Sequence, residues 1–180
     1  KDQTYQIGSL IELIWGIENP AAIINKIADK NIHIITLTIT EGGYNIAKAT
    51  NEFMLDNENI KYDLTHPQSP KTTFGFVAEG LRKRKAVGNG PITILSCDNL
   101  QHNGNTARKA FLSFFQAQDP ELAEWATVNI TFPNSMVDRI TPSTQPEDII
   151  RLNTQNGTQD GAPVYCEDFI QWVVEDKFSA

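Results

Sequence analysis

Residues 33–43 read HIITLTITEGG, and this stretch decides the fold class. It is rich in β-branched residues and places apolar side chains on alternate positions, a pattern that predicts a strand. Gly42 and Gly43 follow almost at once, and paired glycines allow a chain to turn sharply where a sheet ends. The stretch therefore predicts a strand that closes in a tight turn.

Two later stretches repeat this arrangement of an apolar run with a polar end. Residues 91–96 predict a second buried strand, which ends in Cys97-Asp98-Asn99. Residues 128–132 predict a third strand, which stops at Pro133-Asn134, with Asp138 just beyond. If the sheet is parallel, these polar ends converge on one edge, which is where ligands gather in α/β proteins.

Helical segments alternate with these strands. The spacing of apolar residues predicts helices over residues 20–28, 72–85, 105–117 and 120–126. Strands that alternate with helices are typical of an α/β fold with a largely parallel sheet flanked by helices. We interpret the remaining segments as a strand, or a strand running into a short helix, at 5–15, a polar excursion with short helical pieces at 44–70, a short helix at 146–152 and a closing apolar segment at 169–174.

The composition excludes several classes of function. A length of 180 residues suits one domain, and the net charge of −7 argues against a nucleic-acid-binding surface. The apolar runs fall short of the ~20 residues that cross a membrane. The basic run 82–85 predicts the solvated last turn of a helix, where cations suit the helix dipole, rather than a phosphate site. Cys97 and Cys166 form neither a disulfide framework nor a zinc pattern, which fits a reducing cytoplasm.

Four motifs in order carry a family resemblance. They are TITEGGY at 38–44, SCDNL at 96–100 with HNG at 102–104, TFPNSMVDRITP at 131–142 and QWVVEDKF at 171–178. Together they resemble the mannitol dehydrogenase family of long-chain polyol dehydrogenases, which includes mannitol 2-dehydrogenase and the reductases of fructuronate and tagaturonate. The loop around Leu100 is most similar to the mannitol 2-dehydrogenase branch.

This resemblance implies a Rossmann-type domain over residues 1–180 that binds NAD or NADP without a metal. Family members move a hydride between the nicotinamide and a secondary alcohol of a polyol, a ketose or a hexuronate. They begin with a strand and a glycine-rich turn that cradles the pyrophosphate, and no Gly-x-Gly turn of that kind lies in this chain. They also carry a helical second domain with a catalytic lysine. We therefore expect a partial dinucleotide-binding domain that lacks its first glycine-rich βαβ unit and is inactive alone.

The resemblance also assigns roles to site residues. Asn99 would donate a hydrogen bond to the sugar oxygen, and Asp138 would lie near the catalytic lysine and help to control proton passage. The residues expected at the cofactor are Thr40, Glu41, Gly42, Gly43, Asn134 and Val137.

Other interpretations stay open for the same residues. Asn99 could cap a strand end, and Asp138 could pair with Arg139. Asp98 could orient its neighbours, and His102 is expected to be a loop residue. For the chain as a whole, the alternatives are a non-catalytic nucleotide-binding or interaction domain, or a hydrolase that uses Asp98 and Glu41 as acid and base.

Overall fold

The computed structural model describes residues 7–138 and 141–179, in two compact units. The first, here called the sheet unit, consists of Ile14–Met136 and Val173–Ala180. The second consists of Lys1–Leu13 and Val137–Trp172. Within the described residues, no helix combines the length and the apolar character that crossing a membrane requires.

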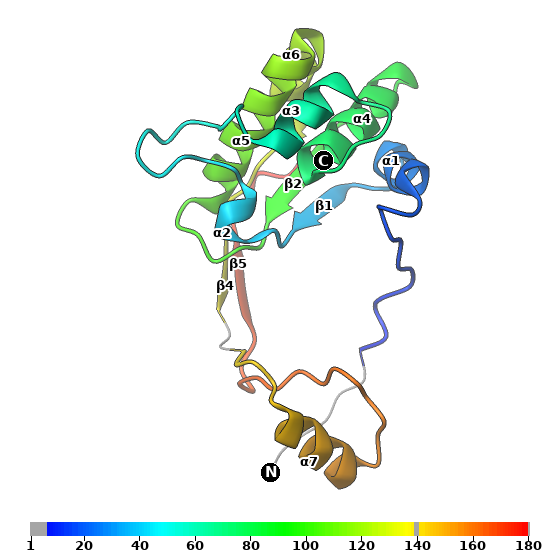
Figure 1. Ribbon diagram of the computed structural model, residues 1–180, viewed down its shortest axis with the longest axis vertical. Helices are drawn as coiled ribbons and strands as arrows, with labels where there is room; N and C mark the ends of the chain where they lie inside the picture. Colours follow the sequence, from blue (N-terminus) through cyan, green and yellow to red (C-terminus); the bar gives the residue numbers. More distant parts are fainter. Residues whose placement is uncertain (1–6, 139–140, 180) are drawn as a thin grey trace. The chain divides into compact units, whose positions relative to one another are not determined.

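A three-stranded parallel sheet forms the centre of the sheet unit. Its strands are β1 (Ile34–Leu37), β2 (Ile92–Ser96) and β3 (Ile130–Thr131), in the order β1-β2-β3. Leu37 pairs with Ser96, and Thr93 pairs with Thr131. The central strand, β2, is buried at every position. Figure 1 shows the arrowheads of β1 and β2 pointing the same way, toward α2, so the predicted parallel α/β fold is confirmed.

The helices begin where the sequence supplies caps. Asn19, Thr72 and Asp119 each accept a hydrogen bond from a backbone N–H in the first turn of α1, α4 and α6. The helices of the sheet unit are α1 (Pro20–Ala28), the single turn α2 (Thr40–Gly43), α3 (Glu58–Thr65), α4 (Thr73–Ala86), α5 (Asn103–Gln118) and α6 (Pro120–Asn129).

The core lies between the sheet and the helices. Phe111, Phe114 and Phe115 of α5 are fully buried and join one apolar cluster with Ile94 of β2 and Phe74 of α4. The rings of Phe74 and Phe111 lie 4.8 Å apart, a distance at which aromatic pairs attract. The aromatic residues of α5 are therefore packing residues, and they fix the position of α5 against β2.

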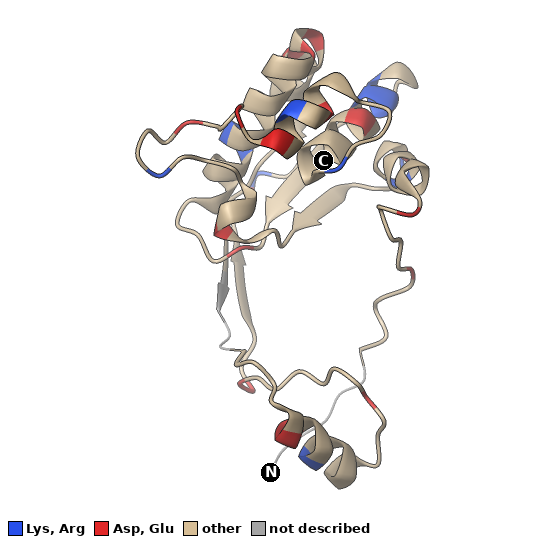
Figure 2. Cartoon of the chain, in the orientation of Figure 1, with Lys and Arg blue, Asp and Glu red and all other residues tan. Residues whose placement is uncertain are grey.

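The basic run at the end of α4, visible as blue segments in Figure 2, is only partly solvated. Arg84 is 1% exposed, and its guanidinium donates hydrogen bonds to four backbone carbonyls, those of Ile27, Asp29, Gly90 and Pro91. Burial lowers the pKa of Arg84. The prediction of a solvated run was therefore wrong for this residue, which ties the end of α1 to the loop before β2.

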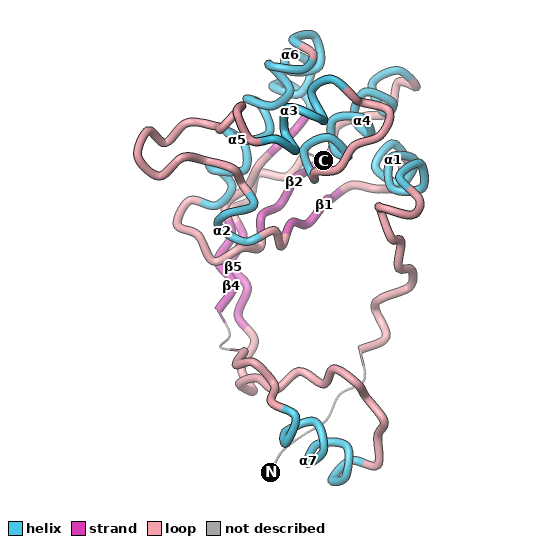
Figure 3. The backbone as a smooth tube through the Cα atoms, viewed as in Figure 1, coloured by secondary structure: helices cyan, strands magenta, loops and turns pink. Residues whose placement is uncertain are grey.

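Two segments differ from the predictions in their secondary structure, because a strand depends on whether a partner strand is present. Residues 7–15 are loop rather than strand or helix (Figure 3), and their apolar side chains are largely exposed, Ile11 by 93%. A strand forms only with a partner, and the described residues supply none for this segment. Conversely, β4 (Ser135–Asp138), which pairs with β5 (Gln171–Val174), was not predicted.

The second unit contains one helix, α7 (Pro146–Asn156), among its described residues. Its start is a capping box, in which Gln145 and Asp148 exchange side-chain and backbone hydrogen bonds. Gly157 ends the helix in a left-handed conformation with a φ of 65°. The predicted helix at 146–152 is therefore confirmed and extends one turn further.

Candidate active site

The carboxyl ends of the three parallel strands form the candidate site. Because Leu37 and Ser96 are neighbours in register, the segments that follow them leave the sheet at the same edge. The loop after β3 leaves from the next position along. Figure 1 shows α2 and the loop between β2 and α5 together at this edge.

Asp98 joins two of these segments directly. Its Oδ1 accepts a hydrogen bond from the Thr40 N–H at 2.8 Å, and its Oδ2 accepts one from the Ile39 N–H at 3.1 Å. The Tyr44 hydroxyl also donates to Oδ2, at 2.6 Å. The turn after β1 and the loop that carries Asn99 are thus held on the same side of the sheet. The predicted convergence of these two strand ends is confirmed.

Tyr44 connects Asp98 to the end of β2 from within the core. It is fully buried, and its hydroxyl lies 2.6 Å from the Ser96 Oγ as well as from Asp98. Burial, and then the hydrogen bond to Asp98, raise the pKa of Tyr44 well above its usual range. Burial, and then the charge of Asp98, also raise the pKa of Cys97. Both groups therefore stay neutral beside the carboxylate.

The turn at residues 40–43 is made differently from its prediction. Thr40 adopts the left-handed conformation, with a φ of 65°, whereas the two glycines do not. A β-branched residue rarely has a positive φ, and the conformation costs roughly 1–2 kcal/mol. Gly43 is needed for packing, because a Cβ there would lie 2.9 Å from the Ile39 Cβ. Only Gly42 faces open space, with no atom within 4 Å of such a Cβ.

Glu41 and Asn99 both reach the solvent. Glu41 forms an exposed ion pair with Lys48 at 3.2 Å, a kind of contact that adds little stability. Asn99 is exposed, and among the described residues its amide makes no hydrogen bond. The alternative that Asn99 caps a strand end therefore has no contact to support it. Its amide is available to a ligand.

Asn103 is a residue of this edge that the sequence did not single out. It is 1% exposed, and its Nδ2 donates to the carbonyls of Ser96, Asp98 and Ser135 at 2.9–3.2 Å. Its Oδ1 accepts from the N–H groups of Gly104 and Ser135. A signal was present, since Asn103 and Gly104 belong to the HNG motif just before the helix predicted at 105–117, and the observed helix begins at Asn103. The motif alone did not reveal that one side chain links all these backbones.

Asn134 connects the end of β3 to the C-terminal segment. Its backbone N–H and its side-chain amide both donate to Glu175 Oε2 at 3.1 Å, and its Oδ1 accepts from the Asn105 N–H. A hydrogen bond from Lys177, and then the Asn134 N–H, lower the pKa of Glu175. Asn134 thus lies at the predicted edge. There it also fixes the start of α5.

The other predicted residues are only partly described. Val137 and Asp138 belong to β4, but their side chains lie outside the described part of the chain, as does Arg139. Their predicted roles stay predictions. His102 is exposed and precedes α5 with a φ of 55°, so it is a loop residue as expected. Among the described residues no cluster of His, Cys, Asp and Glu could hold a metal ion.

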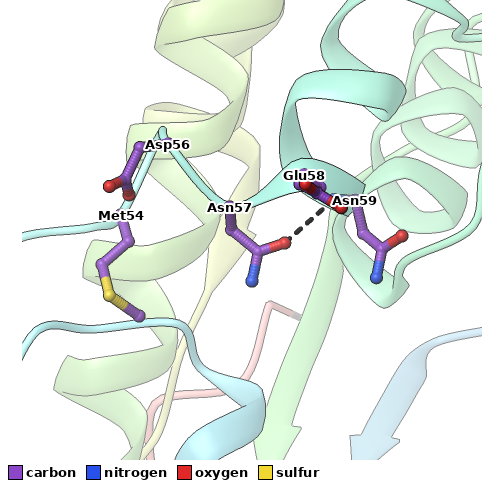
Figure 4. A pocket seen from close by; sticks show the side chains of 5 residues that line it. All are labelled: Met54, Asp56, Asn57, Glu58 and Asn59. Atoms are coloured by element: carbon purple, nitrogen blue, oxygen red, sulfur yellow. Dashed lines mark hydrogen bonds between the residues drawn. The ribbon is translucent and has the colours of Figure 1, made fainter.

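A surface hollow at the start of α3 is a separate feature (Figure 4). It is lined by Met54, Asp56, Asn57, Glu58 and Asn59. The Asn57 side chain points toward α3 and accepts the Asn59 N–H at 3.0 Å, which caps the helix. Two carboxylates beside this start would repel a phosphate. The hollow therefore does not compete with the strand ends as a nucleotide site.

Comparisons with known proteins agree with this geometry. A family model described as the mannitol dehydrogenase Rossmann domain matches residues 1–180. The polyol:NADP oxidoreductase of Gluconobacter oxydans is 49% identical over 96% of this chain and 36% of its own length. A mannitol 2-dehydrogenase of Phaeosphaeria nodorum is 43% identical over 96% of this chain and 30% of its own.

A solved structure is also similar. The mannitol 2-dehydrogenase of Pseudomonas fluorescens, in a ternary complex with NAD and D-mannitol, has 46% sequence identity and a TM-score of 0.93. The match covers 96% of this chain and 35% of that one. The chain thus spans about a third of the length of the relatives it matches.

Proposed function

Because the chain belongs to the mannitol dehydrogenase family, we propose that it forms part of the nucleotide-binding domain of an NAD(P)-dependent dehydrogenase. The proposed reaction moves a hydride between the nicotinamide and a secondary alcohol of a polyol, with the ketose as the oxidised partner. One observation carries the proposal. Asp98 holds the turn at residues 39–43 and the loop of Asn99 at the same edge of a parallel sheet.

We assign two further parts to the whole protein. Among the described residues β1 pairs only with β2, and Ile34 on β1 is 44% exposed. The free edge of β1 is therefore a suitable place for the strand of the glycine-rich βαβ unit, which would hold the pyrophosphate. A helical second domain would supply the lysine base. Both assignments are supported by the relatives' length, since this chain matches only about a third of it.

The residues at the edge fit the nicotinamide half of such a cofactor. Gly42 has open space before it, so a flat ring or a ribose can approach its backbone. Figure 2 marks acidic positions on α2 and on the loop after β2, which disfavour phosphates there. Residues 40–43, Asn134 and Val137 would line the cofactor. When bound, the cofactor accepts or supplies the hydride.

Asn99 would act on the sugar oxygen. As the alcohol loses a proton and a hydride, negative charge develops on that oxygen, and a fixed neutral donor stabilises it. Such a donor contributes roughly 2.7–4 kcal/mol in comparable sites. An exposed amide without another partner among the described residues suits this role, because it donates without titrating. Asp138 would favour the charged form of the lysine through its opposite charge.

The test uses the full-length parent enzyme. Asn99→Ala should lower kcat about 100- to 1,000-fold, because one charge-stabilising donor is lost. The dissociation constant of the cofactor should change less than about twofold, roughly 0.4 kcal/mol. Gln101→Ala, two residues away on the same exposed loop, is the matched control and should keep its turnover. An unchanged kcat in Asn99→Ala would remove Asn99 from the mechanism.

A further inference from the structure

We propose that Asp98 is a positioning residue that holds the turn at residues 39–43 in the conformation that receives the cofactor. The proposal rests on the proposed function, since it assigns a role at the same edge of the sheet. Asp98 itself need not touch the substrate. It acts through the backbone of Ile39 and Thr40, whose N–H groups its carboxylate accepts.

The contacts of Asp98 are those of a group fixed in one orientation. Three donors converge on its two oxygens, namely two backbone N–H groups and the hydroxyl of the buried Tyr44, at 2.6–3.1 Å. In the described part of the chain no Lys or Arg pairs with it. Hydrogen bonds, rather than an ion pair, therefore hold its carboxylate in place. This occupancy also disfavours the hydrolase alternative, because three of the roughly four acceptor positions of the carboxylate are already taken within the protein.

Asp98 binds the backbone at the one residue of the turn that has an unfavourable conformation, Thr40. Thr40 has a φ of 65°, and such a conformation persists in a β-branched residue only when its surroundings enforce it. The Thr40 N–H makes the shorter of the two backbone contacts with Asp98. The Asp98 side chain thus holds the turn, and the next residue in the chain is Asn99, the proposed hydrogen-bond donor to the sugar oxygen.

Both oxygens are required, which makes asparagine a sharp test. An asparagine in the same place offers one acceptor and turns an NH₂ toward either the Thr40 N–H or the pair of Ile39 and Tyr44. The size of the side chain is kept while at least one contact becomes repulsive. Asp98→Asn should therefore release the turn without creating a cavity.

Asp63 provides a matched control in the same unit. Its buried carboxylate also accepts two backbone N–H groups and one hydroxyl, those of Lys71 and Thr72, before α4. It makes no contact with the residues of the strand-end site in the described structure. A variant of Asp63 therefore reports the general cost of losing such a cluster.

The experiment measures the binding of NADH and of NADPH to the full-length enzyme by fluorescence titration. Asp98→Asn should raise the dissociation constant about tenfold. Asp63→Asn should change it less than twofold, even if it lowers the melting temperature as much as Asp98→Asn does. Tyr44→Phe keeps both backbone contacts and should stay within threefold. Equal binding by Asp98→Asn and the wild type, or an equal loss in Asp63→Asn, would overturn the role of Asp98.

A second measurement needs no variant. The Ile39 and Thr40 amides of the wild-type enzyme should be protected from hydrogen exchange, and fast exchange at both would equally overturn the proposal. Failure of the proposed function has a different signature. In that case the wild-type enzyme would bind neither cofactor, and the inference about Asp98 would fall with it.

Discussion

Gly104→Ala tests whether the start of α5 is locked against the end of β3. A Cβ at this position would lie 2.4 Å from the Pro133 carbonyl oxygen and 2.6 Å from that of Phe132. Both obstacles are backbone atoms, which cannot rotate away. The helix start would have to move by at least about 0.6 Å to reach 3.0 Å, the shortest contact that real Cβ atoms show.

This movement would stretch the contacts of the neighbouring Asn103. Its bonds to the carbonyl and the N–H of Ser135 are both 2.9 Å long and would approach about 3.5 Å, past the usual range. Overpacking costs about 1–3 kcal/mol, and each weakened hydrogen bond about 0.5–1.5 kcal/mol. The change from glycine to alanine in a helix returns up to about 1 kcal/mol. The net loss should be about 2–4 kcal/mol.

Thermal unfolding of the full-length protein is the assay. For a domain of this size the expected loss lowers the melting temperature by roughly 5–12 °C. Gly90→Ala is the control, because a Cβ there meets no atom within 4 Å, and its melting temperature should stay near that of the wild type. A melting temperature for Gly104→Ala equal to or above the wild-type value would refute the reasoning, since helix propensity alone predicts an increase.

Two other predictions concern buried polar groups of the sheet unit. Arg84→Met should destabilise the protein by about 3 kcal/mol, because the buried carbonyl of Ile27 loses its donor and three further carbonyls lose a charged one. Arg82→Met on the same helix loses two partly exposed ion pairs and a hydrogen bond to Gln118, and should cost less than about 1 kcal/mol. Equal melting temperatures of the two variants would contradict this. The pKa of Tyr44 is raised on folding, so its contribution to stability is complete below the unfolded pKa of about 10 and is lost as the pH rises through the higher folded value. The difference in melting temperature between the wild type and Tyr44→Phe should therefore shrink from pH 8 to pH 11, and a constant difference would show that Tyr44 does not titrate as its surroundings imply.

The elements that the sequence predicted are those with a local cause. Strands β1 and β2 combine β-branched residues with apolar ones, and the helices carry their own caps, such as Asn19 and Thr72. The convergence of the strand ends followed from the parallel order alone. These features depend on residues close together in the chain, so the sequence pattern was sufficient.

The features that were missed depend on distant partners. The sequence left open that Asp98 orients its neighbours, but its partners Ile39 and Thr40 lie 58–59 positions away, and no local pattern indicates them. Arg84 is buried because the end of α1 supplies two carbonyls, although a row of four basic residues suggests a solvated surface. The roles of Asn99 and Asp138 came from family motifs, since neither residue type nor spacing alone distinguishes a catalytic amide from a capping one.

The contact between Asn134 and Glu175 has a consequence for how the protein is made. The two residues are 41 positions apart, and Thr93 and Ser179, which also bond, are 86 apart. A ribosome adds about 5–20 residues per second, so roughly 2–8 s separate the appearance of Asn134 from that of its partner. During that interval Asn134, which follows β3, lacks the carboxylate that accepts its two hydrogen bonds. Asn134 can therefore reach its final hydrogen bonding only after Glu175 has been synthesised.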